Sequence, residues 1–257
     1  MIVRDRLGEF VMIEQDHHAR ISGEIFSYWQ PEYYRGVKWK KSVLHAVANH
    51  DCGWKMIDQQ PFWNDKKRAP YTFMDFPPPA KTLIYSSGIN EVESRDPYAA
   101  LLCSEHYVRF QQHDETPEAK QFVTSEKARQ HRLMTSITDF KRSLFDFHYG
   151  LLQLCDNLSL YICLNEPGVN KEKEFPFFRK GIPLPHTLNV FSKGVLHARW
   201  LDSHTIGLDE FPLKQPITVS LKQKTVSKEK ISKQGLIESY LATPYETVGI
   251  RLVPTEK

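Results

Sequence analysis

Residues 42–54 read SVLHAVANHDCGW, a stretch in which an apolar helical run ends in an adjacent histidine and aspartate, His50 and Asp51. The apolar residues before the pair follow the recurrence of one buried helix face: Val43, Leu44, Val47 and Ala48. Gly53 then supplies a stop signal. The pattern predicts a helix over residues 39–52 that presents two metal-capable side chains where its packed part ends.

Further polar residues lie inside other predicted apolar helices. In a helix predicted over residues 16–30, His18 shares one face with Ile21, Ile25 and Trp29. The strongly apolar helix predicted over residues 146–164 contains the acidic residue Asp156. His106 lies in a helix predicted over residues 96–113, which opens with an aspartate N-cap and a proline. These helices would bury polar groups, and such burial costs free energy unless each group has a hydrogen-bond partner or an opposite charge.

A metal ion would compensate for that cost. A buried carboxylate is costly unless it is paired or coordinated. Two histidines and two carboxylates suit a divalent transition metal such as Mn, Fe, Co, Ni or Zn, with positions left open to water. Such an ion acidifies a bound water and binds a phosphoryl oxygen. We therefore expect a metal site made of His18, His50, Asp51 and Asp156.

The order His, His-Asp and Asp on successive helices resembles the HD-domain metal-dependent phosphohydrolases. The resemblance covers roughly residues 16–165 and implies that His18, His50, Asp51 and Asp156 jointly bind one ion. It also implies a site role for a histidine in mid-sequence, here His106, which would orient the substrate or bind a second ion. A core histidine bonded to a backbone carbonyl is the alternative for His106.

A narrower resemblance spans nearly the whole chain. The segments EQDHHARISGEI, NHDCGW, DPYAALLCSEHYVRF and LLQLCDNLSLYIC are similar to a bacterial family of uncharacterised proteins. That family carries a domain of unknown function and a β-rich C-terminal part. This similarity supports the fold and brings no activity.

The predicted fold is mainly α, an HD-like helical bundle over residues 16–165 with a small β-rich subdomain, α+β overall. Residues 175–257 should form the β-rich part, packed with an N-terminal strand over residues 2–14. Within it, LNVFSKGVLHARWLD (188–202) is predicted to form a hairpin that turns at Lys193-Gly194. A charged helix is expected over residues 117–145. The β-rich part could complete the pocket, mediate homodimer formation or cap the core.

The prolines of residues 58–79 exclude a continuous helix there, although the segment is rich in aromatic residues. It is interpreted as a pocket wall or lid, or else as an Ω-loop packed for stability. The candidate cations for binding a phosphate are Lys55, Lys66, Lys67 and Arg68. The candidate general acids are Asp58, Asp65 and Glu105.

Composition excludes several classes of protein. The 257 residues carry a net charge of only +3, which argues against a nucleic-acid or membrane-surface partner. There is no apolar segment of the length of a membrane span and no signal-peptide core, so a cytoplasmic protein is expected. The four cysteines lack the spacing of a zinc knuckle or disulfide framework.

The expected function is metal-dependent hydrolysis of a phosphoester in a nucleotide or another small phosphorylated metabolite. Here the ion activates water, with Asp51 and His106 as the catalytic residues. Two alternatives remain open: a degenerate scaffold that binds a small ligand or a protein without turnover, and a di-iron oxygenase.

Overall fold

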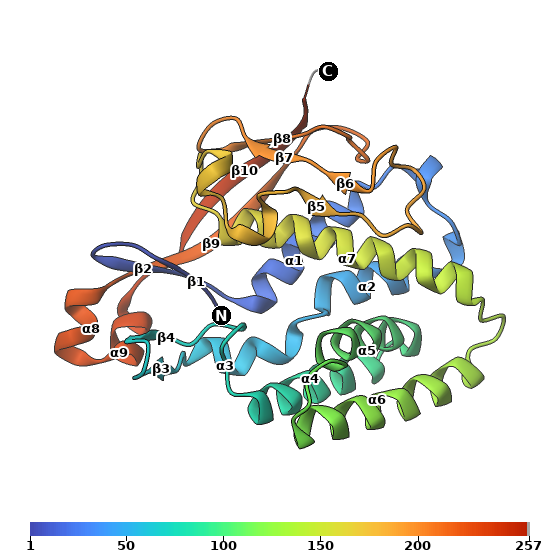
Figure 1. Ribbon diagram of the computed structural model, residues 1–257, viewed down its shortest axis with the longest axis horizontal. Helices are drawn as coiled ribbons and strands as arrows, with labels where there is room; N and C mark the ends of the chain where they lie inside the picture. Colours follow the sequence, from blue (N-terminus) through green and yellow to red (C-terminus); the bar gives the residue numbers. More distant parts are fainter. Residues whose placement is uncertain (256–257) are drawn as a thin grey trace.

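Helix α2 (Lys40–Asn49) lies at the centre of the helical part and packs against α1 (Gln15–Ser27), α5 (Pro97–Gln111) and α7 (Arg142–Leu164). Of the face predicted to be buried, Val43 and Val47 are fully buried, Ala48 is partly buried and Leu44 is exposed, because it lies beside this face and not on it. The computed structural model describes residues 1–255 and has a mainly helical α+β fold, the predicted class (Figure 1).

Close packing of α1 on α2 depends on one glycine. A Cβ atom at Gly23 would lie 2.6 Å from the Cβ of Ala48, so only hydrogen fits between the two helices. This contact brings the helix that carries His18 close to the helix that ends at His50.

Helices α5 and α6 (Pro117–Ser136) each begin with a proline that follows a side-chain cap. The side chain of Asp96 accepts a hydrogen bond from Ala99 N (2.9 Å) at the start of α5. Thr116 caps α6 in the same way. The prediction of one helix over 117–145 was wrong at its end, because α6 stops at Ser136 and Asp139 adopts a left-handed backbone conformation (φ 61°) before α7 begins.

The proline-rich segment is more regular than predicted. It contains the short strands β3 (Trp63–Asn64) and β4 (Ala69–Pro70), and helix α3 (Lys55–Gln59) overlaps its start. The run Pro77-Pro78-Pro79 begins helix α4 (Pro78–Glu93), where a first-turn proline loses no hydrogen bond. The sequence analysis missed α4.

One six-stranded sheet joins the N-terminal hairpin to the C-terminal part in the order β1-β2-β9-β10-β8-β7. All neighbouring strands are antiparallel except β10 and β8, which are parallel. Phe10 pairs with Val226 between β2 and β9. The strand bounds are β1 Ile2–Asp5, β2 Glu9–Ile13, β7 Ala198–Trp200, β8 Thr205–Leu208, β9 Ile217–Ser227 and β10 Glu246–Pro254.

The C-terminal part differs from the prediction in two respects. The hairpin predicted to turn at Lys193-Gly194 does not form. Instead β7 pairs with β8 around residues 201–204, and β6 (Val195–Leu196) pairs with β5 (Ile182–Pro183). Two short helices, α8 (Lys228–Gln234) and α9 (Leu236–Ala242), connect β9 to β10.

A single large hydrophobic cluster runs through both parts. It includes Val47 of α2, Leu152 of α7 and Val219 of β9. Helix α1 packs on β9 as well as on α7, and Figure 1 shows α1 and α7 between the sheet and helices α4–α6. None of the helices within residues 1–255 combines the length and apolarity needed to cross a membrane.

Candidate metal centre

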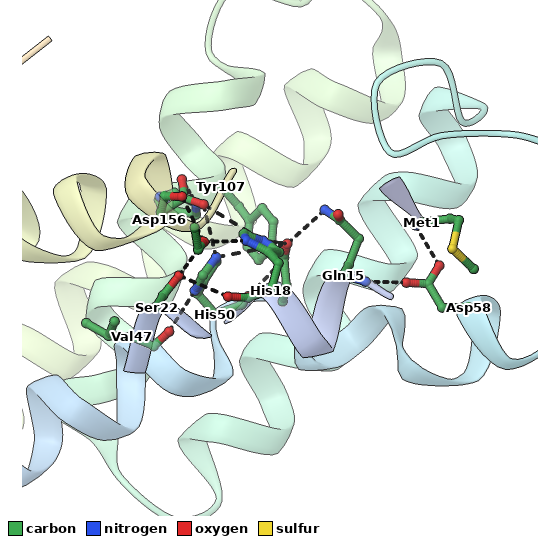
Figure 2. Close-up of polar contacts among 12 residues, drawn as sticks. Met1, Gln15, His18, Ser22, Val47, His50, Asp58, Tyr107 and Asp156 are labelled. Atoms are coloured by element: carbon green, nitrogen blue, oxygen red, sulfur yellow. Dashed lines mark hydrogen bonds and ion pairs between the residues drawn. The ribbon is translucent and has the colours of Figure 1, made fainter. Parts of the chain in front are cut away.

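Four side chains predicted from the sequence lie close together in the interior: His18, His50, Asp51 and Asp156. Figure 2 shows three of them, His18, His50 and Asp156. His18 Nε2 lies 2.9 Å from Asp51 Oδ2 and 3.8 Å from Asp156 Oδ1. His50 Nε2 lies 3.4 Å from Asp156 Oδ1 and 4.0 Å from Asp51 Oδ2. Each of the four residues is at most 6 % exposed.

The four side chains come from three places in the helical part. His18 stands one turn into α1, and His50 and Asp51 follow the last turn of α2. Asp156 lies in the middle of α7, which is buried along most of its length. The centre therefore forms only when three helices far apart in the sequence pack together.

The hydrogen bonds of His50 fix its tautomer. Nδ1 lies 2.9 Å from the carbonyl oxygen of Val47, which can only accept, so Nδ1 carries the proton. In the neutral ring Nε2 then has a lone pair, which is buried, has no hydrogen-bond partner and faces two carboxylates. Such an arrangement needs a cation, either a proton or a metal ion, between nitrogen and oxygen.

His18 is oriented through two serines. Its Nδ1 lies 2.7 Å from Ser159 Oγ, and Ser159 lies 2.7 Å from Ser22 Oγ. Ser159 can donate to the carbonyl of Asp156 (2.9 Å), and Ser22 can donate to the carbonyl of His18 (3.2 Å). His18 Nε2 lies within hydrogen-bond distance of Asp51 Oδ2 (2.9 Å), so the ring presents this nitrogen to the cluster.

The Asp51 carboxylate is held from two sides. Gln15 Nε2 donates to Oδ2 (2.9 Å), and the Tyr107 hydroxyl donates to Oδ1. The same hydroxyl lies 2.7 Å from the carbonyl of His50. Histidine and carboxylate ligands bound this way are fixed in orientation before any ion arrives.

His106 of α5 lies at the edge of the same cluster. Its Nε2 is 3.7 Å from Asp156 Oδ2, and its buried Nδ1 has no hydrogen-bond partner. Its ring lies 5.2 Å, centroid to centroid, from that of His50. The core-histidine alternative required a bond from His106 to a carbonyl, and the structure contains none within residues 1–255.

Charges shift the pKa values of these groups in opposite directions. Burial acts to lower the pKa of His50, but the nearby carboxylates of Asp156 (3.4 Å) and Asp51 (4.0 Å) outweigh it and raise the pKa to about 9. Burial acts to raise the pKa of Asp51, yet His18, His50 and Tyr107 hold it well below its usual range. Burial lowers the pKa of His106 to about 4, so His106 is neutral at pH 7.

The spacing of the donor atoms is compatible with metal binding. Donors about 2.0–2.2 Å from a common ion lie about 2.9 Å apart at a right angle and about 4.2 Å apart when opposite. The four histidine–carboxylate separations, from 2.9 to 4.0 Å, fall in this range. Two groupings, His18-His50-Asp51 and His50-His106-Asp156, could each hold a metal ion, and neither contains all four residues. They share His50, whose single lone pair can bind only one ion.

Two cavities open onto the cluster. A cavity of about 210 Å³ is lined by His18, Asp51 and Tyr107, and one of about 700 Å³ by Arg109 and Gln153. His106 and Asp156 line both. From the aromatic-rich segment 58–79, Phe73 and Met74 line both cavities, so this part of the segment forms a pocket wall.

The proposed catalytic helpers are engaged elsewhere. Lys55 pairs with Asp16 (3.5 Å) and Glu91 (3.8 Å). Asp58 is buried against the N-terminal amine of Met1 (2.6 Å). Lys67 pairs with Asp75 (2.9 Å), which lies outside both cavities.

Glu105 and two further residues with reactive side chains, His148 and Cys52, are likewise occupied or inert. Glu105 pairs with Arg109 (2.8 Å). His148 binds Tyr98 and the carbonyl of Arg35, away from the cluster. Burial raises the pKa of Cys52 to about 12, which makes it a poor nucleophile.

The sequence analysis missed the residues that hold the ligands: Gln15, Tyr107 and Ser159. Helical spacing was an available signal for one of them, because Ser159 is three residues after Asp156 on α7. Gln15 and Tyr107 carry no local signal, since their contacts with Asp51 span 36 and 56 residues. Among cavity-lining cations, Lys81, Arg109 and Arg142 were also missed.

Comparisons with known proteins give one result. No curated protein matches the chain, and no solved structure matches it. One family model, described as "Protein of unknown function (DUF3891)", matches residues 1–228. Because that match covers most of the 257 residues, the chain belongs to the DUF3891 family.

Proposed function

We propose that the chain is a metal-dependent hydrolase of the HD type that acts on a phosphoester of a nucleotide or other small phosphorylated metabolite. The observation that carries the proposal is His50 Nε2, a buried nitrogen without a hydrogen-bond partner that faces Asp51 and Asp156. The order of ligands on α1, α2 and α7 is the order that the HD resemblance implies.

In this proposal His18, His50, Asp51 and Asp156 hold one divalent transition metal ion. When bound, such an ion lowers the pKa of a coordinated water and binds a phosphoryl oxygen. Tyr107 and Gln15 keep the Asp51 carboxylate in place, and the Ser159 hydroxyl keeps the His18 ring turned towards the centre.

His106 would contact the substrate. It lines both cavities next to Asp156, and its low pKa leaves the ring neutral at pH 7. A neutral imidazole offers one N–H donor and one acceptor, so His106 can orient a phosphoryl oxygen or a water without adding charge.

Metal analysis tests the proposal directly. Protein purified without chelators should retain close to one divalent transition metal ion per chain, measured by mass spectrometry of the metals. It should hydrolyse bis-p-nitrophenyl phosphate or p-nitrophenyl phosphate in an ion-dependent way. A protein that retains no ion and shows no ion-dependent hydrolysis overturns the proposal and favours a binding module. Two irons per chain would favour the oxygenase instead.

The variants Asp51→Ala and Asp51→Asn test the ligand set. Both should lose the ion and at least about a hundredfold of the activity, because removal of one of four ligands opens the site. Asp65→Ala is the matched control, because Asp65 is exposed and lies outside both cavities. This variant should keep the ion and the activity. Circular dichroism verifies folding, and an Asp51→Ala protein that keeps its ion contradicts the assignment.

A further inference from the structure

The large cavity extends past the metal centre in both directions. One face of α7 lines it over more than five turns, with Asp156 part of the way along: Arg142, Tyr149, Gln153, Asp156, Leu160 and Leu164. At about 1.5 Å per residue, the cavity follows α7 for about 21 Å on one side of Asp156 and about 12 Å on the other. A phosphorus atom near Asp156 would thus have space on two sides.

The part of the large cavity nearest the start of α7 is polar and is lined by two arginines, Arg109 and Arg142. Arg109 stands one turn after His106 on α5 and lies over the ring of Tyr149 (4.5 Å). Its Nε donates to Glu105 (2.8 Å), a contact that orients the guanidinium and does not use its two terminal nitrogens. Arg142 is held by Asp146 (2.8 Å) through the same atom, and one of its terminal nitrogens lies 4.0 Å from Glu105, which leaves the other unpaired among residues 1–255. Oriented guanidinium groups suit two oxygens of a carboxylate or phosphate.

The side towards the end of α7 is apolar. Leu160 and Leu164 line it together with Phe175, Phe177 and Leu184 from the segment after α7. Phe177 is more than half exposed although it is aromatic, and it lies at the cavity. An apolar group placed there would remove this aromatic surface from water.

We propose, on the basis of the function proposed above, that the substrate is an unsymmetrical phosphodiester. One ester group carries a second anion, a carboxylate or phosphate, that binds Arg109 and Arg142. The other ester group is apolar and lies against Leu164 and Phe177. A monoester would fill only one of the two sides, so the shape of the cavity favours a diester.

The reaction consumes one water. A new P–O bond forms from the water oxygen, and the P–O bond to one of the two alcohols breaks. The proton released by the water goes to the departing alcohol oxygen. The products are one alcohol and one phosphomonoester.

A matched pair of probes tests the anion site. The first is p-nitrophenyl 2-carboxyethyl phosphate, and the second is its carboxamide, p-nitrophenyl 2-carbamoylethyl phosphate. The full chain with Mn²⁺ should hydrolyse the carboxylate with a kcat/KM about 10- to 100-fold higher, the worth of a charge-assisted hydrogen bond. Both diesters should exceed p-nitrophenyl phosphate.

Variants assign the preference to residues. Arg109→Gln should reduce the preference for the carboxylate probe over the carboxamide probe to less than about threefold. Arg142→Gln should weaken the same preference. Arg95→Gln is the matched control, because Arg95 also pairs with a carboxylate one turn away (Glu91, 4.0 Å) but lies outside the cavity. Phe177→Ala should raise KM for both diesters equally, since it removes apolar contact only.

A binding measurement separates this inference from the proposed function. Calorimetry with metal-free protein and 2-carboxyethyl phosphate should show tighter binding than with 2-carbamoylethyl phosphate, and Arg109→Gln should abolish the difference. If no ester is hydrolysed but this difference holds, the anion site stands and the hydrolase fails. If hydrolysis occurs with equal rates for the pair, or best on the monoester, the inference is overturned and the hydrolase stands.

Discussion

At the scale of single residues, buried histidines in this chain serve two different purposes that their hydrogen bonds distinguish. His50 donates through Nδ1 to Val47 and leaves Nε2 without a partner between two carboxylates. His148 is fully satisfied, since Tyr98 donates to Nδ1 (2.7 Å) and Nε2–H donates to the carbonyl of Arg35 (2.8 Å). A satisfied ring needs no further partner, whereas His50 Nε2 needs a cation, either a proton or a metal ion.

The pH dependence of stability should reveal the neutral His148. Burial lowers its pKa to about 4, so the folded protein binds fewer protons here than the unfolded chain, whose pKa is about 6.5. A lowered pKa stabilises the fold above pH 6.5, and this contribution is lost as the pH falls towards 4. Between pH 7.5 and 5 the loss is about 2 kcal/mol.

Urea unfolding of wild type and His148→Phe at both pH values measures this loss. The variant should be less stable at pH 7.5 because Tyr98 loses its acceptor, but it should lose about 2 kcal/mol less than wild type on going to pH 5. An identical pH dependence in the two proteins would show that the pKa of His148 is the same in the folded and the unfolded chain.

At the scale of elements, the turn after α2 determines where the His-Asp pair lies. Gly53 packs directly against the backbone of α4, where a Cβ would lie 2.2 Å from the carbonyl oxygen of Ile84 and 3.0 Å from Gly88 N. Two glycines in contact let α4 approach the loop that carries Asp51. The helix that the sequence analysis missed is thus part of what fixes the ligand.

Gly53→Ala should therefore damage both stability and metal binding. A backbone clash cannot be relieved by a rotamer change, so the free energy of unfolding should fall by about 3 kcal/mol, the upper part of the usual overpacking range. Displacement of Asp51 should weaken Mn²⁺ binding at least about tenfold. Gly8→Ala is the control, because no atom lies within 4 Å of the added Cβ. Equal effects of the two changes would contradict this account.

At the scale of the whole molecule, the helical and β-rich parts share their core and their polar contacts. Arg4 of β1 donates to the carbonyl of Asn165, just after α7 (2.8 Å). Lys222 N of β9 donates to His17 of α1 (3.0 Å). The hydrophobic cluster passes from α2 through α7 to β9. Removal of the sheet would expose the outer faces of α1 and α7 to water.

The chain should accordingly unfold in one step. Calorimetry should give one transition with a van't Hoff enthalpy close to the calorimetric enthalpy, the signature of a cooperative unit. Residues 16–165 expressed alone should lack native helicity, because α1 loses its contacts with β9. Two resolved transitions, or a folded 16–165 fragment, would show two independent domains.

Local patterning in the sequence was sufficient to predict several features of this protein. Apolar periodicity predicted the helix that ends at His50, and the N-cap and proline pairs predicted the starts of α5 and α6. Burial of polarity in apolar helices singled out His18 and Asp156. The helix predictions succeed because helix periodicity and caps depend on neighbours within a few residues.

Only the tertiary structure decided what surrounds those residues. The contacts of Gln15 and Tyr107 with Asp51, the arginines at the large cavity and the sheet order all join segments far apart in the chain. A short strand or a buried polar contact is stabilised mainly by its partner, and a partner distant in sequence leaves no local pattern. The sequence determined which side chains could bind a metal ion, and packing determined that they meet.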